Sequence, residues 1–301
     1  MAPSVLIIGA SGTVGRPLVD EFLKHKSKFA RIAALADPTK VSRFADTLIK
    51  GVEVVVGSFL DSSSYNGFDV VVSLAGNAAM KLQPGMIEAA VAGGVRHFYP
   101  SEYGGDLNFG DNWKNRYFRD KLATRDHLAA KAKEYSDFRY TLILTGPFTE
   151  FAVSSFNGVD METHTAEPYG RPGAELAVTA MSDVMKYIVE SILIPFDAAK
   201  NGQVRELRVP GEARITWEKL IEHLGEAQGV EYTLKYLDPQ GAAEKQEQAR
   251  NNGDEDGQVF WAGKGLFLNG SSVIPGPLDN GKFSFTPETA KETIQRVFGK
   301  K

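Results

Sequence analysis

The sequence contains no cysteine, no long apolar run and no excess of positive charge. The absence of cysteine excludes disulfides, a thiol nucleophile and cysteine metal sites. No apolar run reaches the roughly 18 residues that a membrane-spanning helix needs, and the first apolar stretch is too short for a signal peptide. A net charge of -4 and a pI of about 5.8 give no indication of nucleic-acid binding. We therefore expect a cytoplasmic protein with neither nucleic-acid nor membrane partners.

Metal ligands are scarce as well. The five histidines show no metal-ligand spacing, and the sequence has no zinc motif, nucleophile elbow or P-loop lysine. We therefore expect no metal site. The 301 residues, 43% of them hydrophobic, suffice for one large domain or two modest ones with a substantial core.

A glycine-rich turn stands near the N-terminus, between an apolar strand at Val5–Ile8 and a helix with Pro17 in its first turn. Gly9 permits the tight turn, Gly12 lets the main chain approach a pyrophosphate, and Gly15 lets the helix pack closely. The helix N-terminus offers free N–H groups to the anion. The sequence therefore predicts dinucleotide binding. The phosphate-binding residues expected here are Gly9, Ser11, Gly12, Thr13, Val14 and Gly15.

Short apolar strands alternate with amphipathic helices through the first half, which is typical of a doubly wound parallel sheet, a Rossmann α/β fold. Residues 1–150 are expected to form this dinucleotide-binding domain. Residues 151–301 are expected to form a smaller α/β substrate domain with segments that return to the Rossmann sheet. The expected strands are Val5–Ile8, Arg31–Ala36, Glu53–Val56, Asp69–Leu74, His97–Tyr99 and Tyr140–Leu144, and the expected helices are Pro17–His25, Val41–Ile49, Pro84–Ala92 and Tyr117–Lys133.

The second half is less regular. Phe151–Gly173 is rich in loop-forming residues, and the acidic segment Gly241–Gly257 is predicted to be a mobile loop or a solvated helix. The aromatic run Val259–Trp261 is expected either to close over a ligand or to lie in the core.

The residues after the second strand should select the cofactor. Asp37 stands where an acid would bind a ribose 2′-hydroxyl, whereas Lys40 and Arg43 would neutralise a 2′-phosphate. These two interpretations stay open. The small residues Ala75 and Gly76 end the fourth strand and would let the chain pass beneath the ribose and nicotinamide.

A tyrosine and a lysine are the catalytic candidates. Tyr117 and Lys121 are one helical turn apart, so on a continuous helix they share a face. A neighbouring ammonium lowers the pKa of a phenol, which would make Tyr117 usable as a proton donor or acceptor. Proton transfer by this pair is the prediction; a packing tyrosine beside a solvated lysine is the alternative.

Further candidates follow the fifth and sixth strands. Gly146 and Pro147 force a turn at the sheet edge, where Phe148 would cover a nicotinamide face or pack in the core. The residues expected to contact substrate are Ser101, Glu102, Tyr103, Trp113 and Phe151.

Together these segments resemble the NmrA-like and isoflavone reductase-like group of atypical short-chain dehydrogenases. The motifs that carry the resemblance are Gly9–Gly15, Arg96–Gly104, Lys121–Arg125 and Tyr140–Phe148, and the likeness continues to the terminal helix. The resemblance implies an NADP(H)-binding domain and a Lys121 that acts on substrate beside the nicotinamide. Three positions depart from the reductase pattern. Ala36 stands where the reductases usually have an arginine, Tyr117 stands where they do not usually have a tyrosine, and Gly146-Pro147 replaces a more polar pair.

We expect an NADP(H)-dependent oxidoreductase acting on a small, largely apolar aromatic or heterocyclic metabolite, as a monomer or homodimer. Lys121 would be the general acid/base and would also contact the bound cofactor. Two alternatives remain: a cofactor-assisted cyclase on the same fold, and a non-catalytic dinucleotide sensor.

Overall fold

The computed structural model describes residues 2–196, 203–267 and 272–300. The chain divides into two compact units. Unit 1 is made of Met1–Glu102, Asp120–Leu142 and Met185–Leu207, and unit 2 of Tyr103–Arg119, Ile143–Val184 and Arg208–Lys301. The chain therefore crosses between the units several times, whereas the sequence suggested one main boundary near residue 150 with returning segments.

Unit 1 is built on a seven-stranded sheet with the order β10-β6-β5-β4-β1-β2-β3. The pairings from β6 through to β3 are all parallel. The strands are β1 (Ser4–Ile8), β2 (Arg31–Ala36), β3 (Glu53–Val56), β4 (Val70–Ser73), β5 (His97–Tyr99), β6 (Arg139–Leu144) and β10 (Val204–Arg208). Strand order reverses on either side of β1, which places the topological switch point between β1 and β4.

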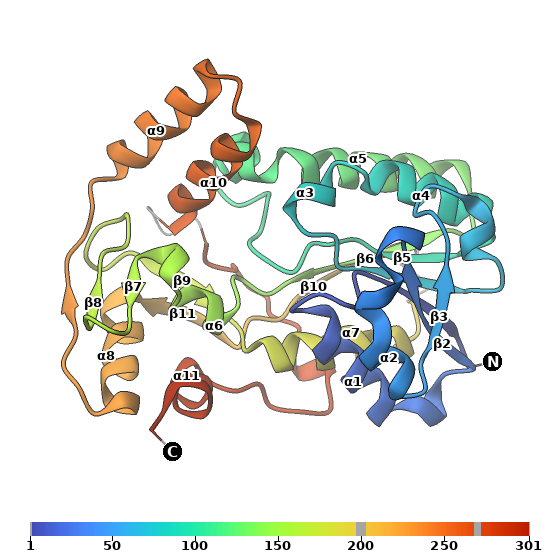
Figure 1. The fold of residues 1–301 in the computed structure, drawn as a ribbon, viewed down its shortest axis with the longest axis horizontal. Helices are drawn as coiled ribbons and strands as arrows, with labels where there is room; N and C mark the ends of the chain where they lie inside the picture. The colour runs from blue at the N-terminus through green and yellow to red at the C-terminus, as the bar shows by residue number, and fades with distance from the viewer. Residues whose placement is uncertain (1, 197–202, 268–271, 301) are drawn as a thin grey trace. The chain divides into compact units, whose positions relative to one another are not determined.

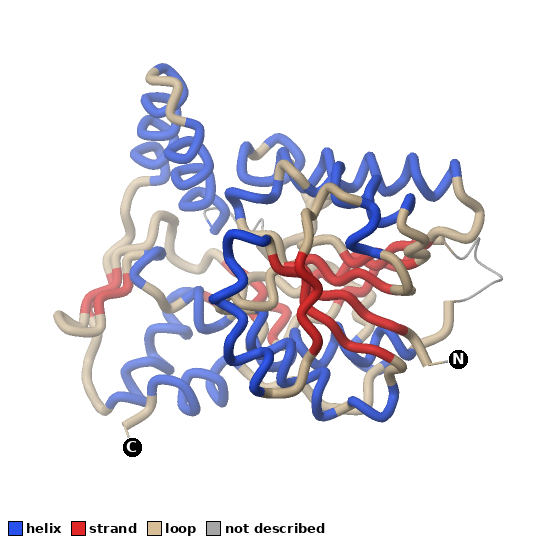
Figure 2. The backbone as a smooth tube through the Cα atoms, turned by 45° about the vertical axis from the view of Figure 1, so that its right-hand side comes forward, coloured by secondary structure: helices blue, strands red, loops and turns tan. Residues whose placement is uncertain are grey.

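Helices cover both faces of this sheet (Figures 1 and 2). Figure 1 shows α4 and α5 on one face and α1 and α7 on the other. The helices are α1 (Gly15–Lys24), α2 (Ala45–Ile49), α3 (Asn77–Met80), α4 (Gln83–Ala92), α5 (Arg119–Glu134) and α7 (Met181–Leu193). The expected Rossmann-like α/β architecture is confirmed.

The central strands are apolar because both of their faces are covered. Every residue of β4 is buried, as are four of the five residues of β1. A strand that is buried on both faces needs apolar side chains on both, so these strands are nearly continuous aliphatic runs and do not alternate polar with apolar residues.

Two predicted helix starts differ in the structure. The helix expected at Val41–Ile49 is a 3-10 helix, η2 (Pro38–Phe44), followed by α2, because Asp37 caps a turn that begins at Pro38. The helix expected from Tyr117 begins two residues later. Tyr117 lies in a separate 3-10 helix, η5 (Arg116–Phe118), whose first turn is capped by the Asn115 side chain.

Unit 2 contains two small sheets and its own helices. Strands β9 and β11 pair antiparallel, while β8 lies between β7 and β12. The strands are β7 (Val159–Asp160), β8 (Thr165–Ala166), β9 (Glu175–Val178), β11 (Glu212–Thr216) and β12 (Thr233–Leu234). The helices are α6 (Thr149–Ala152), α8 (Trp217–Gln228), α9 (Pro239–Asn251), α10 (Glu255–Lys264) and α11 (Ala290–Phe298). The segment Phe151–Gly173, expected to be loop-rich, thus contributes a short helix and two strands.

The acidic segment Gly241–Gly257 is helical over most of its length. It belongs to α9 and the start of α10, which lie side by side as a helical hairpin (Figures 1 and 2). Asp238 caps α9 and Asp254 caps α10 through backbone N–H groups. Of the two alternatives that the sequence left open, the structure shows helix. No helix among the described residues is long and apolar enough to cross a membrane.

Candidate functional site

The glycine-rich turn connects β1 to α1 in unit 1. Gly9 has a φ of +86°, and a Cβ atom there would lie 2.8 Å from the carbonyl oxygen of Leu74. A Cβ on Gly15 would lie 2.1 Å from the Gly9 carbonyl oxygen, so α1 can approach the turn only because Gly15 has no side chain. The first turn of α1 has no side-chain cap and no acidic residue. The turn therefore presents uncapped backbone donors to an anion.

A groove of about 410 Å³ opens beside this turn. All of the predicted cofactor residues before residue 80 line it. They are Gly9, Ser11, Gly12, Thr13, Val14, Gly15, Asp37, Lys40, Arg43, Ala75 and Gly76. The sequence analysis missed the apolar walls of the groove, which are Ile8, Leu35, Phe44, Phe59, Leu74, Ala79 and Met86. Of these, only Ile8, Leu35 and Leu74 lie in or directly after strands whose carboxyl ends were expected to face the cofactor.

Opposite charges meet at the β2 end of the groove. The Asp37 carboxylate accepts hydrogen bonds from the backbone N–H (2.8 Å) and the hydroxyl (2.5 Å) of Thr39. These two bonds hold the pKa of Asp37 below its usual value. Among the described residues, no carboxylate lies within ion-pair distance of the exposed Lys40 or Arg43. Both bonds are to one oxygen, Oδ1, so the acid uses only one of its two carboxylate oxygens on its own turn. The Lys40 charge adds to the lowering of its pKa.

Lys121 lies in the first turns of α5 and is buried, with 8% of its surface exposed. Its ammonium donates a 2.9 Å hydrogen bond to the backbone carbonyl of Glu102. Burial is the main cause that lowers the pKa of Lys121; the Glu102 carboxylate opposes it and the Arg125 guanidinium adds to it. The amine is therefore easier to deprotonate than an ordinary lysine.

A buried ion pair lies next to Lys121. Both oxygens of the Glu102 carboxylate accept from Arg125, at 3.0 Å and 2.8 Å, and Glu102 is 1% exposed. Such a two-point contact fixes the orientation of both side chains. Glu102 was predicted to bind substrate, but its carboxylate is bound to Arg125. Sequence analysis missed Arg125, although its position four residues after Lys121 on the same helix was a usable signal.

A buried glutamine connects this cluster to α4. The Gln83 side chain accepts a 2.9 Å hydrogen bond from the N–H of Ser101 and lies 3.5 Å from the Thr124 hydroxyl. Gln83 is fully buried. Ser101 was predicted to contact substrate, and its backbone is thus held by Gln83. No motif in the sequence pointed to Gln83, because its partners come from α5 and the β5 loop.

Tyr117 does not lie on α5, so the shared helical face expected for Tyr117 and Lys121 is absent. In unit 2, the Tyr117 ring packs against Phe118 and against Gly263 of α10. A Cβ on Gly263 would lie 3.1 Å from the Tyr117 ring. Two residues predicted to contact substrate lie earlier in the same segment of unit 2, Tyr103–Arg119. Tyr103 is half-buried, and Trp113 is 55% exposed.

The turn after β6 belongs to unit 2. Gly146 has a φ of +68°, and a Cβ there would lie 2.5 Å from the carbonyl oxygen of Ala177, so this glycine is required by the close approach of β9. Pro147 and Phe148 then lead into α6, where Phe151 is 38% exposed. Phe148 is half-buried and forms a bridge with Thr179.

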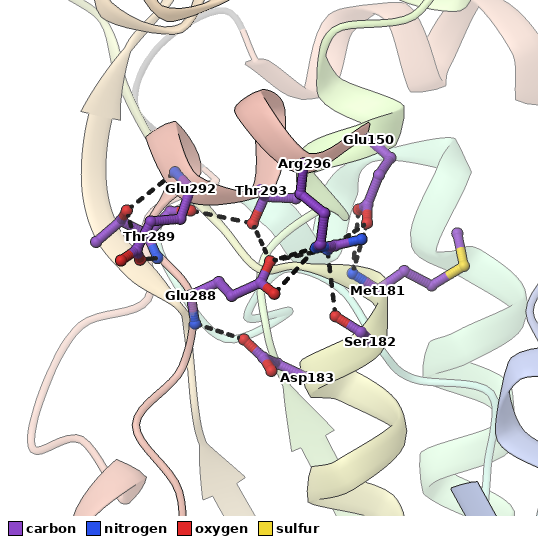
Figure 3. Close-up of polar contacts among 9 residues, drawn as sticks. All are labelled: Glu150, Met181, Ser182, Asp183, Glu288, Thr289, Glu292, Thr293 and Arg296. Carbon is purple, nitrogen blue, oxygen red and sulfur yellow. Dashed lines mark hydrogen bonds and ion pairs between the residues drawn. The ribbon is translucent and has the colours of Figure 1, made fainter. Parts of the chain in front are cut away.

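The C-terminal helix α11 anchors the α6 turn (Figure 3). The Arg296 guanidinium donates to both carboxylate oxygens of Glu288 and lies 3.8 Å from the Glu150 carboxylate of α6. Glu150 in turn accepts from the backbone N–H of Met181, at 3.0 Å and 3.2 Å. The position of Phe151 is therefore held through its neighbour Glu150.

Backbone contacts strengthen the same anchor. The Asp183 carboxylate accepts the N–H of Glu288 at 2.6 Å, and Thr289 begins α11 with a reciprocal capping box to Glu292 (Figure 3). A capped start fixes the direction of α11, which carries Arg296 in its last turn. Among residues 2–196, 203–267 and 272–300, no group of three or more acidic and histidine side chains could hold a metal ion.

Comparisons with known proteins agree with this geometry. Oxidoreductase aprR of Aspergillus flavus is 27% identical over 198 residues, which is 65% of this chain and 65% of the relative. A phenylcoumaran benzylic ether reductase of Populus trichocarpa is 28% identical over 165 residues, 52% of this chain and 53% of the relative. The alignments thus span less than two thirds of the length of these curated relatives.

Solved structures match over nearly the whole chain. A leucoanthocyanidin reductase–NADPH complex from Vitis vinifera has a TM-score of 0.75 at 19% identity, covering 97% of this chain and 98% of that chain. At this identity the likeness shows the fold. The model of the NmrA-like family matches residues 1–245. The resemblance read from the motifs is confirmed, and the chain belongs to the NmrA-like family.

Proposed function

We propose that this chain is an NADP(H)-dependent reductase of a small aromatic or heterocyclic metabolite, with Lys121 as its general acid/base. The observation that carries the proposal is the buried Lys121 ammonium, its pKa lowered, in the same unit as a groove built on a glycine-rich turn. The names of the relatives support it: an oxidoreductase, an ether reductase and a reductase solved with NADPH.

The groove fits an NADP(H) molecule by its chemistry. Gly9 and Gly15 leave room that any side chain would fill, and the uncapped start of α1 offers donors for a pyrophosphate. Lys40 and Arg43 would bind the 2′-phosphate, since both cations line the groove and neither has a carboxylate within ion-pair distance among the described residues. The proposal also includes a contact between the nicotinamide and the turn formed by Gly146, Pro147 and Phe148.

The chemistry divides between the bound cofactor and the protein. A reduced nicotinamide supplies a hydride when it is bound. Lys121 holds a proton on Nζ and delivers it to the substrate atom that gains negative charge. The hydrogen bond to the Glu102 carbonyl orients the amine, and the Glu102–Arg125 pair keeps that carbonyl in place. The part of Tyr117 in proton transfer stays a prediction.

The first test is cofactor binding followed by nicotinamide fluorescence. We expect NADPH to bind more tightly than NADH, and the double variant Lys40→Met/Arg43→Met to lose this preference. Each lost charge-assisted contact to a phosphate is worth about 1.5–3 kcal/mol, so the preference should fall by at least about tenfold. Lys28→Met removes an exposed lysine outside the groove and serves as the control.

The second test is consumption of NADPH with a panel of aromatic and heterocyclic substrates. Turnover by the wild type that Lys121→Met abolishes would support the proposal. Binding of neither dinucleotide would overturn it. Tight NADPH binding with no turnover of any panel member would favour the sensor, and product formed without net cofactor consumption would favour the cyclase.

A further inference from the structure

Unit 2 carries a connected group of aromatic rings, which we call the aromatic cluster: Phe151, Phe156, Phe260 and Trp261. Successive ring centroids are 4.9 Å apart for Phe151–Phe156, 5.2 Å for Phe156–Phe260 and 5.1 Å for Phe260–Trp261. Phe151 is 38% and Phe260 is 42% exposed. Contiguous exposed aromatic rings are uncommon on soluble proteins and mark binding surfaces.

Gly263 explains how the cluster assembles from distant segments. A Cβ on this buried glycine of α10 would lie 3.1 Å from the Tyr117 ring and 3.3 Å from the Phe156 ring. Its missing side chain lets α10 lie close to both rings. The cluster is therefore a packed feature of unit 2, with its rings held by α6, α10 and the 3-10 helix η6 (Ser155–Asn157).

Two lysines lie over these rings. The Lys264 ammonium is 4.7 Å from the centroid of Phe156 and 5.3 Å from that of Phe260. The Lys245 ammonium is 4.4 Å from the centroid of Trp261. Ring faces attract cations, so the cluster holds both ammonium groups in place.

Neither lysine has a carboxylate partner among the residues that the structure describes, although α9 and α10 are rich in acids. Three of these acids have other partners: Glu244 accepts from Gln240, Glu247 pairs with Arg250, and Asp254 caps α10. The other two acids of α10 lie in its first turn, at the opposite end of the helix from Lys264. Burial and the neighbouring Lys245 charge lower the pKa of Lys264. An anion at this point would relieve both effects, and no described side chain provides one.

We propose that Lys264, Phe156 and Phe260 form a substrate subsite for a planar aromatic ring that carries an anionic oxygen, such as a carboxylate. The Lys264 ammonium binds the anion, while the exposed ring of Phe260 contacts the aromatic body. This inference deepens the proposed function, because it names the class of substrate. Phe151 connects the cluster to the turn at Phe148, three residues earlier.

The test uses a matched pair of probes, 2-naphthoate and its uncharged analogue 2-naphthamide, with binding followed by calorimetry in the absence of cofactor. We expect naphthoate to bind wild type about tenfold more tightly than naphthamide, as one charge-assisted contact provides. Lys264→Met should remove this difference, and Lys264→Arg should keep most of it. Phe260→Ala should weaken both probes alike.

Equal affinity of the two probes for wild type would overturn the proposal, as would an unchanged difference in Lys264→Met. The melting temperature of each variant confirms that it folds. NADPH titration of the same variants separates the two proposals. Loss of the naphthoate preference in Lys264→Met with intact NADPH binding would support the subsite and leave the proposed reductase standing. Failure of the wild type to bind NADPH would overturn the reductase, while the probe data would still decide the subsite.

Discussion

Two lysines, one in each unit, have a pKa lowered chiefly by burial, yet their surroundings differ. Lys121 lies beside the Glu102–Arg125 ion pair, where one charge raises its pKa and the other lowers it. Lys264 lies over aromatic rings, where the only charged neighbour that affects its pKa is the like charge of Lys245.

The difference indicates what each amine is suited to do. Around Lys121 the Glu102 and Arg125 charges offset each other, so the ammonium adds one buried positive charge to the cluster and loses its proton more readily than an ordinary lysine. Around Lys264 positive charge is in excess, so the binding of an anion is favourable. One surrounding therefore suits proton transfer, and the other suits recognition.

The largest expected effect is on catalysis. Lys121→Met should lower kcat by about 10²–10⁴-fold, the usual contribution of a positioned general acid. Lys264→Met should instead raise KM for an anionic substrate and leave kcat nearly unchanged. Steady-state kinetics on one substrate would separate the two lysines. Equal losses of kcat in both variants would contradict the comparison.

Arg125→Met should produce the largest loss of stability. It leaves the Glu102 carboxylate buried without its partner, which costs about 3–5 kcal/mol. Chemical denaturation would measure this loss. The double replacement Glu102→Gln/Arg125→Met serves as a control, because it removes the buried charge and should recover much of the stability.

A pH dependence should follow from Lys121. Since its pKa is lowered in the folded protein, the unfolded chain binds more protons between that lowered pKa and about 10.4. Wild-type stability should therefore rise with pH across this window, by up to about 1.4 kcal/mol per pH unit, and Lys121→Met should lack this rise. Parallel curves for the two proteins would show that the amine keeps its ordinary pKa in the fold.

The smallest effect is expected for Lys245. It is exposed and has no ion pair among the described residues, so Lys245→Met should change the free energy of unfolding by no more than about 0.5 kcal/mol. The same replacement removes the like charge near Lys264 and should weaken naphthoate binding slightly. A loss as large as that of Lys264→Met would assign the anion to Lys245 instead.

The sequence predicted best where backbone geometry dictates the residue. Gly9 and Gly15 could be placed because only glycine tolerates the positive φ of one and the close contact of the other. The parallel sheet was likewise evident from strands buried on both faces.

The parts that escaped prediction depend on contacts between distant segments. Gln83 acts through Ser101, and Phe156 meets Phe260 across about a hundred residues of chain. Tyr117 was placed on the wrong helix because a side-chain cap, Asn115, starts a separate turn, Arg116–Phe118, directly before α5. Local spacing carries no information about such pairings, so only the folded arrangement reveals them.

The order of strands has a consequence for how this protein can be inherited or engineered. β10 lies at one edge of the unit 1 sheet, next to β6, yet it follows residues 143–184 of unit 2 in the chain. A fragment cut at residue 150 would leave β6 as an unpaired sheet edge, a site for aggregation. A single recombination event therefore cannot exchange one unit for another. The segments of the two units meet at five points along the chain, and a swap would need a crossover at each of them, including those on either side of residues 185–207, which carry β10.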